Sequence, residues 1–257
     1  MKELYNDSYL KKSTEFINHV KQESYKILNF NNQDVILEIG CGNGYDSIEL
    51  AKKVLPTKGR VIGLDVDLDL VETSKKNAHT AACTNIEFIV GDAEKLPFED
   101  NYFSIIRAER VFQHLKNPLI VFKEALRVLK PGGQLVLVET DWPGMNIYLK
   151  DFSLEEKIIH TLTHKLLVNG NASRTLLSYY IDLNVSNVEM KVFPVLVNEY
   201  KIANELVKFD HILEAGKTNN ILTEKDIDEW NNNTSFLIKH NLFNLTANLI
   251  IFSGNKP

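Results

Sequence analysis

A short apolar run followed by three closely spaced glycines constrains this chain more than any other feature. Val35–Ile39 has the composition of a buried strand, and Gly40, Gly42 and Gly44 follow it at alternating positions. Glycine has no Cβ, so a turn built from glycines lets the backbone approach a ligand closely. The strand is apolar almost throughout, which is typical of a parallel sheet covered on both faces. The run therefore predicts a strand, a ligand-binding turn and the start of a helix.

The spacing of the glycines distinguishes between two kinds of ligand. A dinucleotide fingerprint is G-x-G-x-x-G, and its third glycine allows close packing of the helix on the strand. Here the third glycine comes one residue early, and Tyr45 stands at the position that the fingerprint requires. The carboxylate of Glu38 would repel a pyrophosphate but suits the cationic amino group of a methionine moiety. The turn therefore favours S-adenosylmethionine over a nicotinamide dinucleotide.

Carboxylates are predicted at the ends of the next two strands as well. The strand at 60–65 ends in Asp65, which can accept both hydroxyls of a ribose in charge-assisted hydrogen bonds. The strand at 86–90 is followed by Asp92, which can accept the exocyclic amine of an adenine. Further strands are predicted at 103–106 and 134–139. Strands that alternate with helices build an open parallel sheet, and ligands bind outside the carboxyl ends of its strands.

Together these motifs resemble those of the class I S-adenosylmethionine-dependent methyltransferases. The glycine-rich turn, the acid that closes the second strand, the segment 91–98 (GDAEKLPF) and the turn 129–133 (LKPGG) follow the family's order and spacing. They cover roughly residues 33 to 140, and 91–98 is most similar to the ubiquinone-biosynthesis-like and small-molecule branch.

The resemblance implies a fold and a set of cofactor contacts. The expected fold is α/β, with a Rossmann-like seven-stranded sheet, mostly parallel with an antiparallel last strand, helices on both faces and helical cap insertions. S-adenosyl-L-methionine would be the cofactor and S-adenosyl-L-homocysteine its product. The residues implied to contact the cofactor are Glu38, Gly40, Gly42, Asp65, Val66, Asp92, Ala93 and Arg110.

We expect a single methyltransferase domain over 1–257, with two cap insertions at about 142–182 and 201–240. The caps would lie over the carboxyl edge of the sheet and form the acceptor pocket, because binding residues gather on loops held by a rigid scaffold. Residues 8–29 predict an amphipathic helix that either covers the cofactor or packs on the sheet. The predicted core segments are 30–141, 183–200 and 243–254.

Methyl transfer requires alignment of the acceptor and, where the acceptor is protonated, removal of a proton. His114 follows the fourth strand and suits a base near neutral pH. Asp141 follows the fifth strand, next to Trp142, whose ring could line the pocket of an aromatic acceptor. Arg174 could meet an anionic acceptor. The alternatives are a histidine at a helix start, a turn or helix-cap aspartate, and a solvated arginine.

Composition limits the partners. The formal net charge is −5 and no basic stretch is present, which argues against nucleic acid as a partner. Cys41 and Cys83 lack C-x-x-C spacing, which indicates a reducing compartment and no structural zinc. His160 and His164 are spaced like metal ligands on a helix but lack a third ligand, so we expect no metal. No apolar run is long enough to span a membrane, and we expect a cytoplasmic protein without membrane insertion.

Three functions are compatible with these residues. The first is methyl transfer to an O, N or C nucleophile of a small-molecule acceptor by in-line displacement. The second is a protein of the same fold that binds the cofactor without methyl transfer, as a cyclase or a regulatory protein. The third, which the glycine spacing and Glu38 disfavour, is a nicotinamide-dependent oxidoreductase. The sequence leaves the acceptor and the oligomeric state open.

Overall fold

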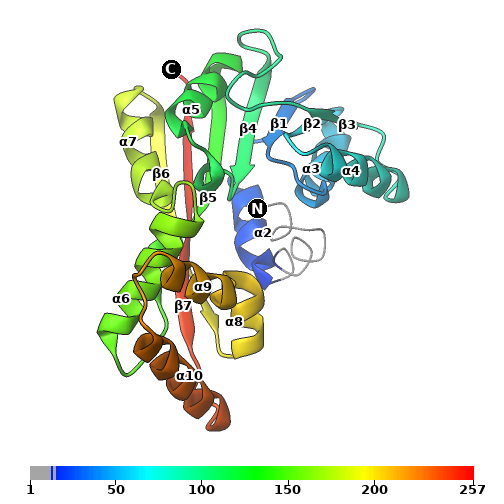
Figure 1. Ribbon diagram of the computed structural model, residues 1–257. Coiled ribbons are helices and arrows are strands. Elements are labelled where there is room, and N and C mark those ends of the chain that lie inside the picture. Colours follow the sequence, from blue (N-terminus) through cyan, green and yellow to red (C-terminus); the bar gives the residue numbers. More distant parts are fainter. Residues whose placement is uncertain (1–12, 14–15) are drawn as a thin grey trace.

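One mixed sheet runs through the molecule (Figure 1). The computed structural model describes residue 13 and residues 16–257. Within this part of the chain, seven strands pair in the order β3-β2-β1-β4-β5-β7-β6. The strands are β1 (Val35–Ile39), β2 (Arg60–Asp65), β3 (Ile86–Val90), β4 (Phe103–Glu109), β5 (Leu129–Asn146), β6 (Ser186–Val197) and β7 (Leu245–Asn255).

The last strand runs against its neighbours. The strands β1 to β5 pair in parallel, whereas β7 lies between β5 and β6 and is antiparallel to both. The predicted fold class, a Rossmann-like and mostly parallel sheet with an antiparallel last strand, is confirmed.

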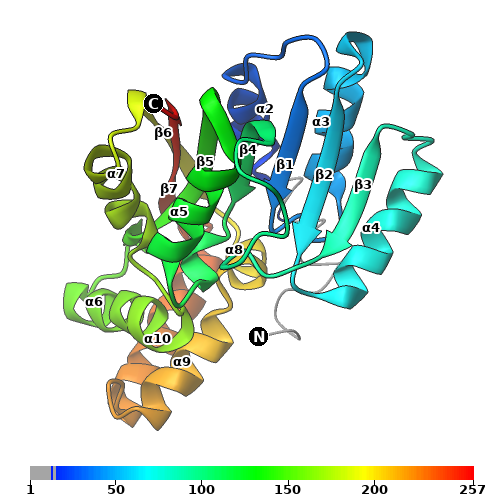
Figure 2. The ribbon, with the colours of Figure 1, turned by 90° about the horizontal axis from the view of Figure 1, so that it is seen from above.

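Helices connect and cover the strands (Figure 2). No helix in the described part of the chain is both long and apolar enough to cross a membrane. The helices are α2 (Asn18–Lys26), α3 (Tyr45–Val54), α4 (Leu68–Thr80), α5 (Pro118–Val128), α6 (Phe152–Thr161), α7 (Ala172–Asp182), α8 (Tyr200–Val207), α9 (Phe209–Thr218) and α10 (Glu224–Lys239), with short helical turns η1 (Leu55–Thr57), η2 (Phe112–His114) and η3 (Leu162–Leu166).

Both faces of the sheet are buried, which explains the apolar run in β1. Leu37 packs in one cluster with Phe122 of α5 and Leu176 of α7. Ile36 packs in another with Val20 of α2 and Leu50 of α3. Successive side chains of a strand point to opposite faces, so a strand covered on both sides needs apolar residues at successive positions.

The predicted N-terminal helix is described in part. Residues 8–12 and 14–15 of the predicted range 8–29 lie outside the described residues, and α2 spans Asn18–Lys26. Its buried residues include Val20, Ser24 and Tyr25, which face the sheet and α3.

Four helices gather at the end of the sheet toward which β4 points: α6, α8, α9 and α10 (Figure 1). An aromatic cluster joins three of them, with the rings of Phe209 and Trp230 4.8 Å apart and Tyr200 stacked 6.1 Å from Phe209. In contrast, α7 packs on β5 and β7, where the Tyr180 hydroxyl donates to the Leu135 carbonyl at 3.3 Å. The division into core and cap segments stays a prediction.

Strand β5 is longer than the predicted 134–139. It begins at Leu129, includes the glycine turn expected to precede it, and continues to Asn146. Pairing with β7 shifts register between Asp141 and Asn146. Pro143 lies in this gap and has no N–H to donate, so the strand continues there with an interrupted ladder.

Candidate active site

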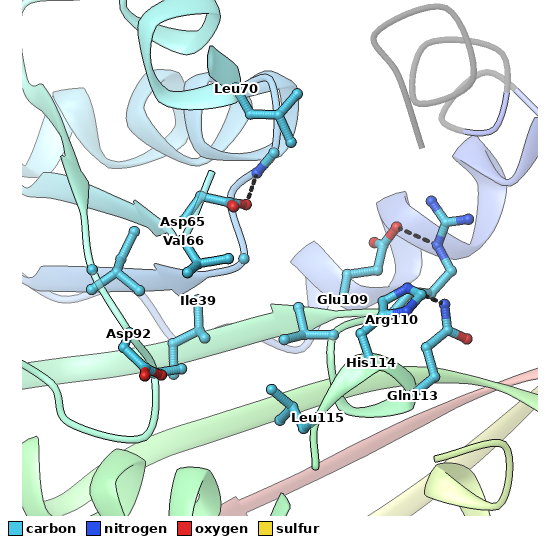
Figure 3. Close-up of a pocket in the computed structure, with 16 residues that line it drawn as sticks. Ile39, Asp65, Val66, Leu70, Asp92, Glu109, Arg110, Gln113, His114 and Leu115 are labelled. Atoms are coloured by element: carbon cyan, nitrogen blue, oxygen red, sulfur yellow. Dashed lines mark hydrogen bonds and ion pairs between the residues drawn. The ribbon is translucent and has the colours of Figure 1, made fainter. Parts of the chain in front are cut away.

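A cavity of about 340 Å³ opens at the carboxyl ends of the parallel strands (Figure 3). Its wall is built from the turn after β1, the ends of β2 and β4, and the segments after β3 and β4. Most of the predicted cofactor residues converge here, together with one predicted catalytic residue. The predicted residues on this wall are Gly40, Gly42, Asp65, Val66, Asp92, Ala93, Arg110 and His114.

The glycine turn is shaped by its backbone. Gly40 and Gly44 have φ angles of +68° and +82°, a region that side-chain-bearing residues adopt with strain. A Cβ added at Gly40 would also lie 2.4 Å from Cγ2 of Val111. Glycine at this position therefore lets β1 turn beneath the cavity while Val111 closes in from the other side.

Asp65 is fixed at the tip of β2. Its carboxylate accepts the backbone N–H of Gly42 at 2.8 Å (Figure 3). It also accepts the backbone N–H of Asp67 at 2.9 Å. Burial raises the pKa of Asp65, and these backbone donors oppose the rise. Two carboxylate oxygens have about four lone-pair sites, so Asp65 can accept further hydrogen bonds from a ligand.

An apolar slot lies beside Asp65. Val66 is 75% exposed and faces the cavity, together with Leu70, Ala93 and Leu115. Asp92 is exposed at the rim, where its carboxylate accepts the backbone N–H of Glu94 at 2.8 Å. These residues offer apolar side chains to a ring and a carboxylate to a polar edge of that ring.

Glu38 differs from the other predicted cofactor residues. It is 2% exposed, stands apart from the cavity wall and accepts a hydrogen bond from Arg107 Nη1 at 2.6 Å. The two residues face each other in register across β1 and β4. Burial raises the pKa of Glu38, and Arg107 opposes the rise. The structure thus places Glu38 in an interior ion pair and not on the cavity wall, because Arg107 lies opposite it on β4 and donates to its carboxylate.

Glu109 takes the position at the wall that Glu38 was expected to hold. Its carboxylate accepts hydrogen bonds from Lys21 of α2 and from Arg107. Lys21 also donates to Asp46 of α3 at 2.6 Å and, with Arg107, holds the pKa of that carboxyl below its usual range although burial alone would raise it. Sequence reasoning missed Glu109 as a site residue, although it closes β4 as Asp65 closes β2.

Arg110 follows in a strained conformation. Its φ angle is +54°, and its backbone N–H donates to the Val138 carbonyl at 2.7 Å. The guanidinium donates to Ser13 Oγ at 2.6 Å and lies 3.6 Å from Glu109. The hydrogen bond to Val138 and the contacts of the guanidinium hold Arg110 in this backbone conformation.

His114 is neutral near pH 7. Burial, aided by Arg110, lowers its pKa to about 4. Its Nε2 lies 3.0 Å from Gln113 Nε2 (Figure 3), and the Gln113 oxygen accepts the indole N–H of Trp142 at 2.6 Å. These bonds connect the cavity wall to the predicted acceptor residue Trp142.

Asp141 and Arg174 form an ion pair. Arg174 Nε donates to Asp141 at 3.0 Å, and Ser173 donates to the same oxygen at 3.2 Å. The predicted base and the predicted anion-binding group thus form one ion pair, away from the wall of the 340 Å³ cavity.

A second cavity of about 50 Å³ meets the first at Arg110. Among the residues that the structure describes, Ser13, Thr140 and Arg110 are its polar lining residues. Its apolar residues come from the segment before α2, from the sheet and from α8. They are Phe16, Ile17, Trp142, Val195, Val197, Leu206, Val207, Leu245, Ala247 and Leu249.

No group of three or more His, Cys, Asp or Glu side chains in the described residues could hold a metal ion. The rings of His160 and His164 stack 4.3 Å apart.

Residues 30–177 match the family model of a methyltransferase domain, and the chain belongs to this family. It is 40% identical over 135 residues to a demethylmenaquinone methyltransferase of Lactococcus lactis, across 52% of this chain and 53% of the relative. The chain spans about half the length of the curated relatives that it matches.

Solved structures share the fold at low sequence identity. The YcgJ protein of Bacillus subtilis has a TM-score of 0.66 and 21% identity, over 93% of this chain and 98% of that one. Phosphoethanolamine N-methyltransferase 2 of Haemonchus contortus, solved with phosphomonomethylethanolamine and S-adenosylhomocysteine, has a TM-score of 0.60 and 16% identity, over 100% and 59% of the chains. The cyclase SpnF has a TM-score of 0.58 and 19% identity, over 93% and 80%.

Proposed function

We propose that this protein transfers the methyl group of S-adenosyl-L-methionine to an O, N or C nucleophile of a small-molecule acceptor. The observation that carries the proposal is the convergence of the glycine turn, the carboxylate of Asp65 and the apolar slot beside Val66 on one cavity. When bound, the cofactor supplies a methyl carbon that the acceptor's lone pair attacks while the C–S bond breaks and its electrons stay on sulfur.

The residues present fit this cofactor. Asp65 would accept the ribose hydroxyls, in addition to the two backbone donors that orient it. Val66 and Ala93 would hold the adenine, with Asp92 at its amine. The positive φ of Gly40 turns the chain along the cavity wall, so the backbone of Gly40 and Gly42 would lie beside the methionine part.

The methionine end would lie against the charged wall at the end of β4. Arg110 offers a guanidinium to its carboxylate, and Glu109 lies beside it. Glu38 would act on this end indirectly, by fixing Arg107 and through it Glu109.

Of the two proposed catalytic residues, His114 has the better position. It lines the cavity as a neutral imidazole and can accept a proton or a hydrogen bond from a protonated acceptor. A base with a pKa of about 4 is weak near neutral pH, so alignment of the acceptor would supply most of the rate. Asp141 would act through Arg174 as part of the acceptor's surroundings.

Titration calorimetry tests the cofactor. We expect S-adenosylhomocysteine to bind with a Kd in the micromolar range, which corresponds to a binding free energy of about −8 kcal/mol. We expect NAD to bind far more weakly. Tighter binding of NAD would overturn the proposal and return the oxidoreductase to consideration.

A cofactor-binding protein without methyl transfer remains the second candidate function, because the cyclase SpnF shares the fold. Mass spectrometry of an acceptor library incubated with the protein and methyl-deuterated cofactor separates the two. Labelled product supports methyl transfer, whereas conversion of a library member without label supports the second function.

The free thiols of Cys41 and Cys83 support a reducing, cytoplasmic compartment as the site of action. The negative net charge supports a small molecule as partner in preference to nucleic acid.

A further inference from the structure

We propose that the second cavity binds the apolar end of the acceptor, so that the acceptor is an amphipathic small molecule. It would carry a short hydrocarbon group in this cavity and an oxygen-bearing group beside Arg110. The proposal rests on methyl transfer as the proposed function and deepens it by naming the class of substrate.

The lining of the second cavity indicates what it can hold. Of the thirteen described residues that line it, ten are apolar and one, Arg110, is charged. Such a cavity disfavours a polar or charged occupant, because few partners are present for buried polar groups. A hydrocarbon group gains about 0.8 kcal/mol for each methylene that it buries.

Arg110 lies where the two cavities meet. It lines both, and it donates to Ser13, a polar residue of the second cavity. Arg110 and its partner Ser13 are therefore at the border with the cofactor cavity, where an acceptor oxygen would have to lie to receive a methyl group. Its hydrocarbon part would then point away from the cofactor, between β7, β6 and α8.

Trp142 provides a fixed wall for this group. Its indole N–H donates to Gln113 at 2.6 Å, and Gln113 contacts His114 on the wall of the cofactor cavity. Since its polar atom is engaged, the indole ring presents apolar surface to the second cavity. The ring is held without help from a ligand, which lowers the entropic cost of binding.

The size of the second cavity limits the occupant. Its volume of about 50 Å³ is well below the roughly 300–1,000 Å³ of pockets that enclose whole ligands. It therefore admits a short alkyl chain or the edge of a ring, and the rest of the acceptor lies toward the first cavity.

A series of 4-alkylphenols, from methyl to butyl, serves as the probe. With the S-adenosylhomocysteine-loaded protein, calorimetry should show affinity rising roughly fourfold for each added methylene until the cavity is filled. The matching 4-(hydroxyalkyl)phenols should show no such rise. Affinity that is independent of chain length, or equal for the alkyl and hydroxyalkyl series, overturns the proposal.

Ala247→Leu tests the location. Ala247 lines the second cavity from β7, so the larger side chain should fill it and lower the affinity for 4-butylphenol at least tenfold. The binding of S-adenosylhomocysteine should remain unchanged. Thr246→Leu is the matched control, on the adjacent position of β7, and should retain the chain-length dependence. The same dependence in Ala247→Leu as in the wild type overturns the proposal.

Val197→Ala keeps the test decisive should Ala247→Leu fail to fold. This variant enlarges the second cavity, so the longest chain that still gains affinity should increase by one or two carbons. An unchanged optimum contradicts the proposal. Titration of the phenols without S-adenosylhomocysteine separates the two claims, because the apolar cavity should still bind them even if the cofactor assignment is wrong.

Discussion

Replacement of Gly40 by alanine should damage both folding and cofactor binding. Alanine at a φ of +68° costs about 1–2 kcal/mol from backbone strain alone. Its Cβ would also lie 2.4 Å from Val111 Cγ2, and displacement of a packed side chain typically costs about 1–3 kcal/mol. We therefore expect the free energy of unfolding to fall by roughly 2–5 kcal/mol.

The chain offers a matched control for the strain. Gly132 has a similar φ of +73°, but a Cβ there has nothing within 4 Å among the described residues. Gly132→Ala should lose only the strain contribution and should bind S-adenosylhomocysteine normally. The difference between the two variants in urea unfolding isolates the contact with Val111.

A double substitution tests the contact directly. In Gly40→Ala with Val111→Ala, the steric part of the loss should be recovered, although the smaller Val111 side chain removes some packing of its own. Equal stability of Gly40→Ala and Gly132→Ala would refute the reasoning about Val111. Wild-type affinity of Gly40→Ala for S-adenosylhomocysteine would refute the close approach of a ligand to this turn.

Three further changes have definite expected outcomes. Burial raises the pKa of Glu139 to about 8, so the folded state keeps a proton that the unfolded state releases above pH ~4.3, and stability should fall as pH rises toward 8. In urea unfolding at pH 5 and pH 8, Glu139→Gln should show a smaller decline than the wild type, and the remainder is due to Glu38, whose pKa burial also raises; an equal decline in both proteins would exclude Glu139 as a source. Lys21→Met should cost roughly 3 kcal/mol, because it removes one of the two cations between Asp46 and Glu109 and leaves Arg107 as the other. A loss of stability no greater than that of the exposed control Lys26→Met would contradict the buried network. His114→Ala should lower turnover by about 10²-fold once an acceptor is known, with no break in the wild-type pH profile near 6.5, since the pKa lies near 4; full turnover would remove His114 from the mechanism.

The residues at the carboxyl ends of the strands could be predicted from the spacing of strands and helices along the sequence. A parallel sheet brings the carboxyl ends of its strands to one edge, so the spacing alone assigns the glycine turn, Asp65 and Asp92 to one site. The antiparallel β7 followed from the family resemblance, and its position between β5 and β6 agrees.

Pairings between distant segments were not predictable. Arg107 forms an ion pair with Glu38 because the register of β1 and β4 places the two residues opposite each other. No local sequence pattern encodes that register. Arg174 likewise forms an ion pair with Asp141 because α7 packs beside β5, a contact between segments that are distant in the sequence. The apolar lining of the second cavity comes from several separate segments, each of which has the composition of ordinary core.

The affinity of Asp65→Ala for S-adenosylhomocysteine tests the central claim most directly. Calorimetry should show binding weakened by about 1.5–3 kcal/mol relative to the wild type, because charged hydrogen bonds to the ribose are lost. Glu72→Ala, an exposed change on α4, should bind as the wild type does. Urea unfolding must show that the Asp65 variant is folded, since Gly42 and Asp67 lose an acceptor as well. Unchanged affinity in a folded Asp65→Ala protein would contradict the placement of the cofactor in this cavity.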